Sequence, residues 1–318
     1  GRPISASDQL AALGWVVRAA DSSFVHVSRS AGALANHLTM KQVARSVLNV
    51  GILLAIAYAT LCVMLYFRQD TLLFFPTTAI DRTPAENGRL FEEVLLPVRE
   101  HATCAWFVPA SAGSRGTVLF SHGNAGNIGD RIESIEIWIE LGFDVLIYDY
   151  GGYGKSTGAP SEARCYEDIR ASHRWLVESK GVEPDRLVLF GRSLGAGPTL
   201  QLAKETECAA VIVESTFRSV PQLGSEVFWW LPVKLLARNR FDNESKIAQV
   251  NAPVLVAHSP DDTIIPYPHG RALFEAAREP KSFLEFRGDH NEGFWISGDT
   301  YRLGLDGFLS SHLSNAPR

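Results

Sequence analysis

The sequence predicts an α/β fold with a mostly parallel, eight-stranded sheet covered by helices on both faces. From about residue 90, short apolar runs bounded by Gly, Pro or Asp alternate with longer segments of helical character. Several runs, such as Thr117–Ser121 and Asp144–Tyr148, are apolar on both faces, as parallel strands buried between two helix layers should be. Alternation of strands and helices at this spacing indicates a doubly covered sheet.

The expected elements can be placed in chain order. Eight strands are predicted at Glu93–Val98, Ala102–Val108, Thr117–Ser121, Asp144–Tyr148, Leu187–Phe190, Ala209–Glu214, Pro253–His258 and Ser282–Phe286, and helices at Asp130–Leu141, Ser161–Ser179, Leu194–Glu205, Tyr267–Ala277 and Phe294–His312. The first two strands have no helix between them, so they should form an antiparallel hairpin at one edge. Residues 217–249, between the sixth and seventh strands, are too many for a plain crossover loop.

The fifth strand runs into a Gly-x-Ser-x-Gly pattern. Gly191 and Gly195 flank Ser193, which predicts a nucleophile elbow, a sharp turn from strand to helix that presents one serine. Glycines at these positions let the strand and helix approach each other. The helix that follows points its positive N-terminal end at the serine. Ser193 is therefore the predicted nucleophile, and an ordinary glycine-rich turn is the alternative.

A serine hydroxyl needs a base, which must come from one of the four histidines after Ser193. His258 ends a strand, His269 lies in a predicted helix and His312 is near the C-terminus. His290 lies in a polar turn directly after the last strand, at the edge of the sheet where the nucleophile elbow also opens. His290 is the predicted base, and a surface loop histidine is the alternative.

The carboxylate that orients the base should lie between these two residues in sequence. Asp261 and Asp262 both follow the seventh strand, and we favour Asp262 because it comes four residues after the strand-ending His258. The resulting order, Ser193, Asp262 and His290, is the chain order of an α/β-hydrolase triad.

An oxyanion intermediate requires two fixed N–H donors. Leu194, directly after the nucleophile, is predicted to supply one donor, and Asn124, in the glycine-rich loop after the third strand, the other. A phosphate-binding loop is the rival interpretation of this segment, but the Gly-Lys-Ser/Thr ending of such loops is missing.

The N-terminal part predicts a membrane anchor. Residues 46–67 form an uncharged apolar run of 22 residues, preceded by Lys41 and Arg45 and followed by Arg68. This length suffices to cross a bilayer as a helix, so residues 40–69 are predicted to be an uncleaved signal anchor. A cleaved signal peptide and a buried core helix are the alternatives.

Residues 1–39 show no sustained period and are predicted to be a poorly ordered extension, with Met40 resembling a natural start. A weakly amphipathic helix around residues 10–20 is the alternative. Residues 70–318 then form the catalytic domain. The slight excess of basic residues before the span favours an extracytoplasmic domain, whereas the lack of an obvious disulfide framework weighs the other way.

The amino-acid composition argues against several classes of partner and cofactor. The net charge is −5, and acidic and basic residues are interspersed, which argues against nucleic acid. The four cysteines, Cys62, Cys104, Cys165 and Cys208, lie far apart without metal-type spacing and are interpreted as free thiols. No metal or organic cofactor is expected, and the sequence gives no indication of oligomeric state.

Several segments resemble one known family. They are His122–Asn127, Asp149–Ser156, Gly191–Gly197, His258–Asp262 and the juxtamembrane Gln69–Pro76. The chain resembles the single-pass, membrane-anchored α/β-hydrolase-domain serine hydrolases, a group that includes protein depalmitoylases and many members of unassigned substrate. The resemblance implies the fold, the triad and hydrolysis of esters or thioesters. The cysteine-rich N-terminus of the depalmitoylating members is absent. A more distant similarity to prolyl-oligopeptidase-type hydrolases also exists.

The sequence thus predicts a membrane-anchored serine hydrolase that acts on a small acyl ester, a lipid or an acylated protein. A peptidase or amidase on the same fold and a non-catalytic, membrane-tethered binding domain are the alternatives. The resemblance implies a small cap over the site at residues 217–249. On a helix there, Phe228, Trp229 and Trp230 would spread over about 200°. At least one of them is expected to line the acyl pocket or face the membrane, and packing of the cap onto the domain is an equally open alternative.

Overall fold

The computed structural model describes the backbone of residues 6–111 and 113–313, and the side chains of residues 39–111 and 113–313. The chain divides into two compact units, Gly1–Met64 and Leu65–Arg318. The first unit contains most of helix α1 (Ala6–Leu73), and the second contains the end of α1 and all other elements.

Helix α1 contains the predicted span. Its segment Thr39–Leu73 is long and apolar enough to cross a membrane, and the side chains of that apolar window are not buried in the protein. The backbone is also helical over residues 6–39, beyond the alternative expected for residues 10–20. No proline interrupts the chain between Pro3 and Pro76, which permits one continuous helix. Poor order of residues 1–39 stays a prediction, because residues 1–5 and the side chains up to residue 38 lie outside the described part.

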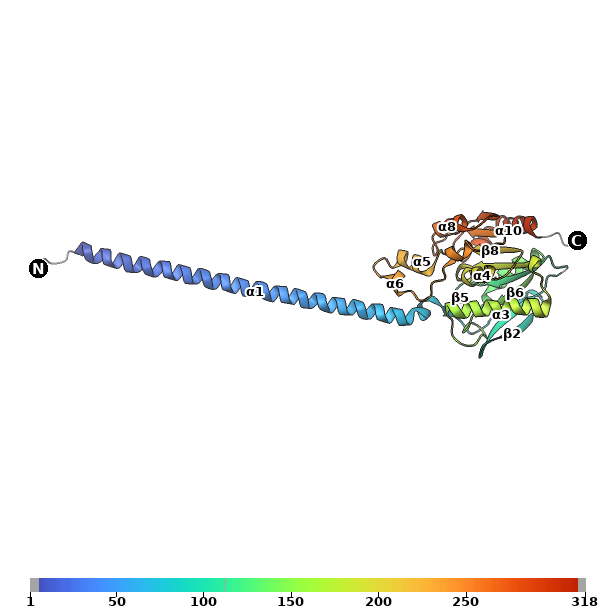
Figure 1. The fold of residues 1–318 in the computed structure, drawn as a ribbon, viewed down its shortest axis with the longest axis horizontal. Helices are drawn as coiled ribbons and strands as arrows, with labels where there is room; N and C mark the ends of the chain where they lie inside the picture. The colour runs from blue at the N-terminus through green and yellow to red at the C-terminus, as the bar shows by residue number, and fades with distance from the viewer. Residues whose placement is uncertain (1–5, 112, 314–318) are drawn as a thin grey trace. The chain divides into compact units, whose positions relative to one another are not determined.

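The second unit is built on an eight-stranded sheet, as the sequence predicts (Figure 1). Its strands are β2 (Glu92–Val98), β3 (His101–Val108), β4 (Thr117–Ser121), β6 (Asp144–Tyr148), β7 (Leu187–Arg192), β8 (Ala210–Glu214), β9 (Val254–His258) and β10 (Lys281–Glu285). They lie in the order β10-β9-β8-β7-β4-β6-β3-β2. The predicted β2–β3 hairpin forms one edge and is antiparallel, as is the β3–β6 pair; the other neighbours are parallel.

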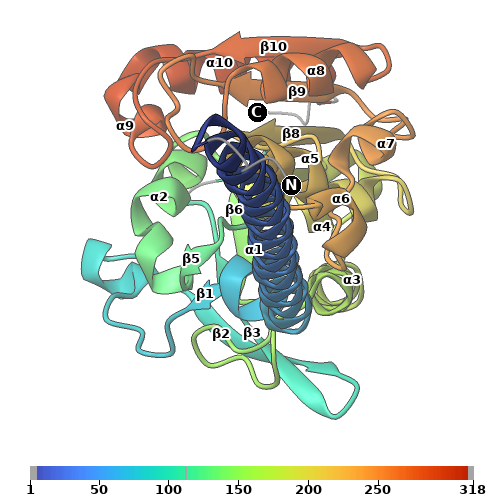
Figure 2. The same cartoon turned by 90° about the vertical axis from the view of Figure 1, so that its left-hand side faces the viewer.

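Helices cover both faces of this sheet. The structure contains α2 (Ile132–Glu140), α3 (Glu162–Lys180), α4 (Ala196–Ala203), α8 (Pro268–Ala276), α9 (Gly293–Ile296) and α10 (Gly298–His312). One core cluster joins the sheet to α3, α4 and α8, and a second joins its other face to α2 and α10. Figure 2 shows α2 on one side of the strands and α3 and α4 on the other. The helix predicted over residues 294–312 is divided at Gly298, whose φ is +47°.

A two-stranded sheet was not predicted. Strand β1 (Phe75–Pro76), just after α1, pairs in parallel with β5 (Ala125–Gly126) in the loop after β4. Each strand has two residues, too few to show a period in the sequence. The pairing places the segment that follows α1 beside the loop that contains Asn124.

The cap insertion consists of three short helices, α5 (Val220–Val227), α6 (Val233–Leu236) and α7 (Asn243–Ile247). Phe228, Trp229 and Trp230 lie in the turn between α5 and α6, so the assumption that they share a helix is wrong. Pro232 disfavours helical backbone at Leu231, so α5 could not continue through this turn into α6 as one helix.

Candidate active site

The nucleophile elbow forms where predicted. Strand β7 passes through a 3₁₀ turn at Ser193–Gly195 into α4, and Ser193 has a φ of +53°. A left-handed conformation at a residue other than glycine costs on the order of 1–3 kcal/mol and is characteristic of functional sites. Glycine is required at the two neighbouring positions because the surrounding backbone leaves no space for a Cβ atom. A Cβ on Gly195 would lie 2.0 Å from the Ser121 carbonyl oxygen, and one on Gly191 would lie 2.6 Å from the Gly195 carbonyl oxygen.

The structure brings the three predicted triad residues together. Nε2 of His290 lies 3.0 Å from Oγ of Ser193, and Nδ1 lies 2.7 Å from Oδ2 of Asp262. All three side chains are buried. Because a carboxylate can only accept, Nδ1 carries the proton toward Asp262, and in the neutral ring Nε2 accepts from the serine hydroxyl. The geometry is that of a nucleophile, a base and a group that orients the base.

Asp262 is held as an anion. Its Oδ1 accepts hydrogen bonds from the N–H groups of Ile264 and Ile265, at 2.9 and 2.8 Å. Burial by itself raises the pKa of the Asp262 carboxyl, but hydrogen bonds from His258 and His290 and the backbone together lower it well below its usual range. A carboxylate that stays ionised is suited to stabilise a histidine when it becomes positively charged.

Asp261, the competing candidate, lies elsewhere. Its Oδ2 accepts from the N–H of Gly288 at 3.3 Å, and its Oδ1 lies 3.6 Å from the Arg287 guanidinium. The side chain is half exposed, and its hydrogen bond and ion pair go to Gly288 and Arg287 and not to His290. The structure therefore places Asp262, and not Asp261, beside the base.

A second histidine supports the same carboxylate. Nε2 of His258 lies 3.5 Å from Oδ2 of Asp262 and 3.0 Å from the Ile265 carbonyl oxygen, so it carries a proton between two acceptors. The ring is fully buried, and a Cβ on Gly270 would lie 2.4 Å from its Nδ1. The sequence analysis treated His258 only as the end of a strand. In the sequence, the indication of this contact was the spacing of four residues between His258 and Asp262.

The two predicted oxyanion residues lie in the same pocket as Ser193. Leu194 follows Ser193 directly, and the neighbouring loop approaches closely, since a Cβ on Gly123 would lie 3.6 Å from Cβ of Ser193. The hydroxyl of Tyr153 donates to the Asn124 carbonyl oxygen at 2.6 Å and accepts from the N–H of Phe75 at 3.2 Å. Tyr153 thus holds the carbonyl group of Asn124, a contact that the sequence does not reveal.

Behind this loop lies a buried polar pair. Nε2 of His122 lies 3.4 Å from Oδ1 of Asp149, and both side chains are fully buried. The hydroxyl of Tyr150 donates to the His122 carbonyl oxygen at 2.6 Å, and Oδ1 of Asp149 accepts from the N–H of Ile128 at 3.0 Å. Burial raises the pKa of the Asp149 carboxyl. These contacts explain why the motifs after β4 and β6 carry polar residues at buried positions.

Arg192, between the glycine and the serine of the elbow, forms a buried ion pair under the pocket. Its Nε lies 2.6 Å from Oε1 of Glu214, and Nη1 donates to Oγ of Ser134 at 2.8 Å. The guanidinium also stacks 4.1 Å from the ring centre of Phe294. Its charge is therefore already compensated within the protein.

The triad opens into a cavity of about 880 Å³. Apolar side chains from three parts of the unit line it, in addition to the catalytic loops: Leu73 at the end of α1 and Phe75 of β1, Phe217 and Leu223 from the cap, and Ile264, Ile265, Phe294 and Trp295 from the segments after β9 and β10. Phe228, Trp229 and Trp230 are not among its lining residues. The cavity has the size and apolar character of a small-molecule site.

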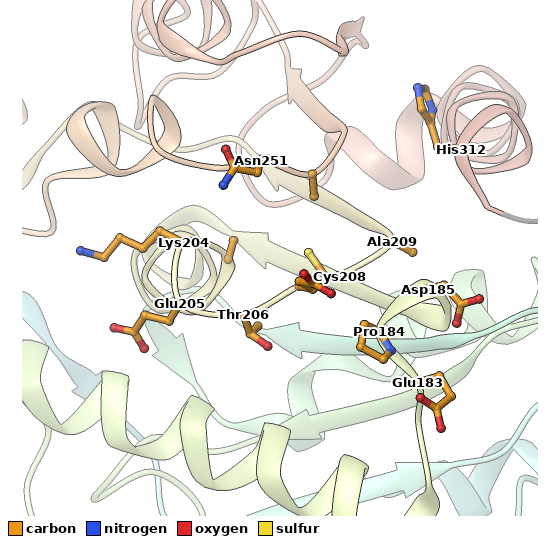
Figure 3. Close-up of a pocket in the computed structure, with 13 residues that line it drawn as sticks. Glu183, Pro184, Asp185, Lys204, Glu205, Thr206, Cys208, Ala209, Asn251 and His312 are labelled. Carbon is orange, nitrogen blue, oxygen red and sulfur yellow. The ribbon is translucent and has the colours of Figure 1, made fainter.

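A second hollow of about 930 Å³ lies at the opposite edge of the sheet, before the strands β7, β8 and β9 begin (Figure 3). Its residues include Lys204, Cys208 and His312 but none of the triad. Burial raises the pKa of the Cys208 thiol to about 12, which keeps it protonated. Among the described residues, no group of three or more His, Cys, Asp or Glu side chains is arranged to hold a metal. The expectation of a cofactor-free reaction stays a prediction.

Comparison with known proteins identifies relatives over most of the chain. Residues 112–247 match the family model described as serine aminopeptidase, S33. An uncharacterized protein of Mycobacterium tuberculosis is 32% identical over 266 residues, which cover 83% of this chain and 95% of the relative. Alpha/beta hydrolase domain-containing protein 17C of Xenopus tropicalis is 38% identical over 202 residues, 63% of this chain and 61% of that protein.

Solved structures share the fold. An esterase of Pyrococcus furiosus superposes with a TM-score of 0.64 at 17% identity, over 76% of this chain and 98% of the esterase. The esterase Est1E of Butyrivibrio proteoclasticus, solved with ferulic acid, gives a TM-score of 0.56 at 16% identity, over 67% of this chain and 98% of that one. The solved structures show the fold alone. Alpha/beta hydrolase domain-containing protein 17B of Homo sapiens is 35% identical over 211 residues, 66% of this chain and 71% of that protein, which shows that the chain belongs to the α/β-hydrolase-domain family of serine hydrolases.

Proposed function

We propose that this protein is a membrane-anchored hydrolase that cleaves carboxylic esters or thioesters through an acyl-enzyme on Ser193. The observation that carries the proposal is the continuous chain of hydrogen bonds from Ser193 through His290 to Asp262, at 3.0 and 2.7 Å. The strained backbone of Ser193 supports it, because such strain persists where the surroundings over-determine it.

The reaction proceeds in two halves. In the first, His290 takes the hydroxyl proton as Ser193 attacks the acyl carbon, and then gives that proton to the departing alcohol or thiol. In the second, His290 activates a water that attacks the acyl-enzyme, and the proton returns to Oγ of Ser193 as the carboxylic acid leaves. Asp262 orients the ring and stabilises its charged form. The N–H groups of Asn124 and Leu194 stabilise the oxyanion in both halves.

The cavity favours an apolar acyl group. Leu73, Phe75, Phe217 and Leu223 offer apolar surface beside the nucleophile, and Arg192 is already paired with Glu214. A small acyl ester, a lipid or an acylated protein are the substrate classes that this surface suits.

A peptidase is the second candidate, favoured by the family description of the matched model as a serine aminopeptidase. An aminopeptidase has to recognise a free α-amino group, and Asp130, Glu133 and Glu292 line the cavity. Of these, Asp130 already accepts from the N–H of Asn127 at 2.9 Å, and Glu133 pairs with Arg82 at 2.7 Å. Two of the three carboxylates are thus engaged, so we rank ester and thioester hydrolysis first.

One assay tests these alternatives on the full-length protein. A panel of p-nitrophenyl esters of increasing chain length is run beside acyl thioesters and aminoacyl anilides. We expect turnover of esters and thioesters; turnover of anilides alone would favour the peptidase.

Removal of the nucleophile should have the largest effect of any substitution. Ser193→Ala should reduce turnover by about 10⁶-fold, because the acyl bond can no longer form, and should also abolish labelling by a fluorophosphonate probe. Ser310→Ala, on the exposed side of α10, is the matched control and should change neither readout. Labelling that persists in Ser193→Ala would overturn the assignment, and a wild-type chain that neither reacts nor turns over would indicate a non-catalytic binding domain.

We further propose that the catalytic domain lies outside the cytoplasm, on the slight excess of basic residues before the apolar run. A C-terminal alkaline phosphatase fusion should then be active and a C-terminal green fluorescent protein fusion dark. The opposite pair of results would place the domain in the cytoplasm, within reach of lipidated cytosolic proteins.

A further inference from the structure

Part of the cap insertion exposes large apolar side chains. Trp229, in the turn after α5, is 82% exposed and Leu235, in α6, is 83% exposed, while Phe228 and Trp230 are about half exposed. We call these four residues the cap face. Helices α5 and α6 lie side by side at one end of the domain (Figure 1). Apolar groups gathered in this way are typical of surfaces that are covered by a partner or a membrane.

Basic residues border the cap face. Lys234 lies within α6, and Arg238 and Arg240 follow it; all three are exposed. Tryptophan and phenylalanine beside lysine and arginine are the composition of segments that lie at the boundary between lipid headgroups and acyl chains. The charge and the apolar side chains therefore favour the same partner.

The cap is bonded to the end of helix α1 within the same compact unit. Nε2 of Gln69 donates to the Leu236 carbonyl oxygen at 2.8 Å, and Oε1 accepts from the N–H of Arg238 at 2.7 Å. Asp70 pairs with the Arg238 guanidinium at 3.1 Å and accepts from the side chain of Asn239 at 2.6 Å. The residues directly after α6 are thereby tied to residues 69 and 70.

These bonds hold the residues after α6 beside the first charged residues that follow the apolar run. The uncharged run ends at Phe67, and Arg68 and Asp70 are the first charges after it. Charged side chains are expensive in hydrocarbon, so these residues mark the bilayer surface when residues 46–67 span it. Leu236 and Arg238 are held at the same level, and the cap face precedes them by a few residues in the chain.

We infer that the cap face docks on the lipid bilayer, so that the acyl chain of the substrate enters the catalytic cavity from the membrane. This inference rests on the proposed anchored hydrolase and narrows its substrates to long-chain esters or thioesters that reside in the bilayer. The cavity is continuous with the same two segments, because Leu223 of α5 lines it together with Leu73 and Phe75 after the anchor. Trp295, also in its lining, is largely exposed.

Fluorescence tests the docking without any need for activity. The full-length protein is placed in lipid nanodiscs whose acyl chains carry bromine, a short-range quencher of tryptophan. We expect strong quenching in the wild type that is reduced in the Trp229→Phe/Trp230→Phe variant. Trp175→Phe, in α3, is the matched control and should leave the quenched fraction unchanged. Equal quenching in the wild type and the double variant would overturn the inference.

Kinetics test the entry route. Trp229→Glu/Leu235→Glu should reduce hydrolysis of a long-chain p-nitrophenyl ester dissolved in the nanodisc by roughly tenfold, because charge opposes contact with the bilayer, and should leave hydrolysis of water-soluble p-nitrophenyl acetate unchanged. Leu90→Glu/Leu303→Glu places the same charges at exposed leucines outside the cap and should affect neither substrate. An equal loss on both substrates, no loss on either, or a change of oligomeric state would overturn the inference. A wild type no more active than Ser193→Ala on either ester would instead refute the proposed function.

Discussion

The catalytic loops and the cap insertion differ in whether their side chains find partners within the protein. Ser193, Asp262 and His290 are buried, and the polar atoms that join them are within hydrogen-bonding distance of one another. In the cap, Trp229 and Leu235 are almost fully exposed. A buried polar site must provide its own partners, because water is excluded from it. An exposed apolar face gains little from its own chain, so its partner has to be sought outside the protein.

After removal of the nucleophile, the largest loss of activity is expected when the triad carboxylate is neutralised. Asp262→Asn should lower kcat by about 10⁴-fold, because an amide favours the wrong tautomer of His290. Asp261→Asn is the matched control and should have a far smaller effect, since that side chain contacts the Gly288 backbone and Arg287 instead. Steady-state kinetics on one soluble ester are enough to compare kcat in the two variants. Similar losses in both variants would mean that the loop after β9 orients the base differently from the geometry described here.

This contrast also explains what could be predicted from the sequence. Strands β4 and β6 match their predicted bounds, because buried strands appear as short apolar runs with clear limits. Ser193 and His290 could be found because each occupies a loop at a defined place in the alternation of strands and helices. The helix expected over residues 294–312 was too long because a single internal glycine, Gly298, does not reveal whether its φ is positive.

The supporting contacts were harder to predict. Tyr153 lies 29 residues after Asn124, and no motif in the sequence links the two. For His258, the only indication was its spacing of four residues from Asp262. For Phe228–Trp230, the helix assumed from composition failed because Pro232 lies close downstream. Local patterns thus predict elements and reacting groups, whereas the contacts that position those groups depend on the tertiary fold.

A smaller effect is expected when one positioning contact is removed. Tyr153→Phe should lower kcat by about tenfold, less than the 10²–10³-fold that follows loss of an oxyanion donor itself, because Asn124 would be held less firmly through its carbonyl group. KM should stay near its wild-type value, since the contact matters more in the transition state than in the bound substrate. Tyr166→Phe removes a hydroxyl that contacts Glu162 outside the catalytic cavity and should leave kcat unchanged. A rise in KM with constant kcat would indicate a role in substrate binding instead.

The smallest effect is expected for a substitution in the cap, and it concerns stability and not activity. In detergent solution, Trp229→Ala should change the free energy of unfolding by no more than about 0.5 kcal/mol, as is usual for exposed positions. Trp138→Ala offers the matched contrast, because that side chain is buried between the rings of Phe143 and Phe190 and its loss should cost about 3–5 kcal/mol. Denaturant unfolding of the full-length chain measures both. A cost at Trp229 close to that at Trp138 would mean that the cap aromatics pack onto the domain. A negligible cost would leave contacts outside the chain as the reason for an exposed tryptophan in the cap.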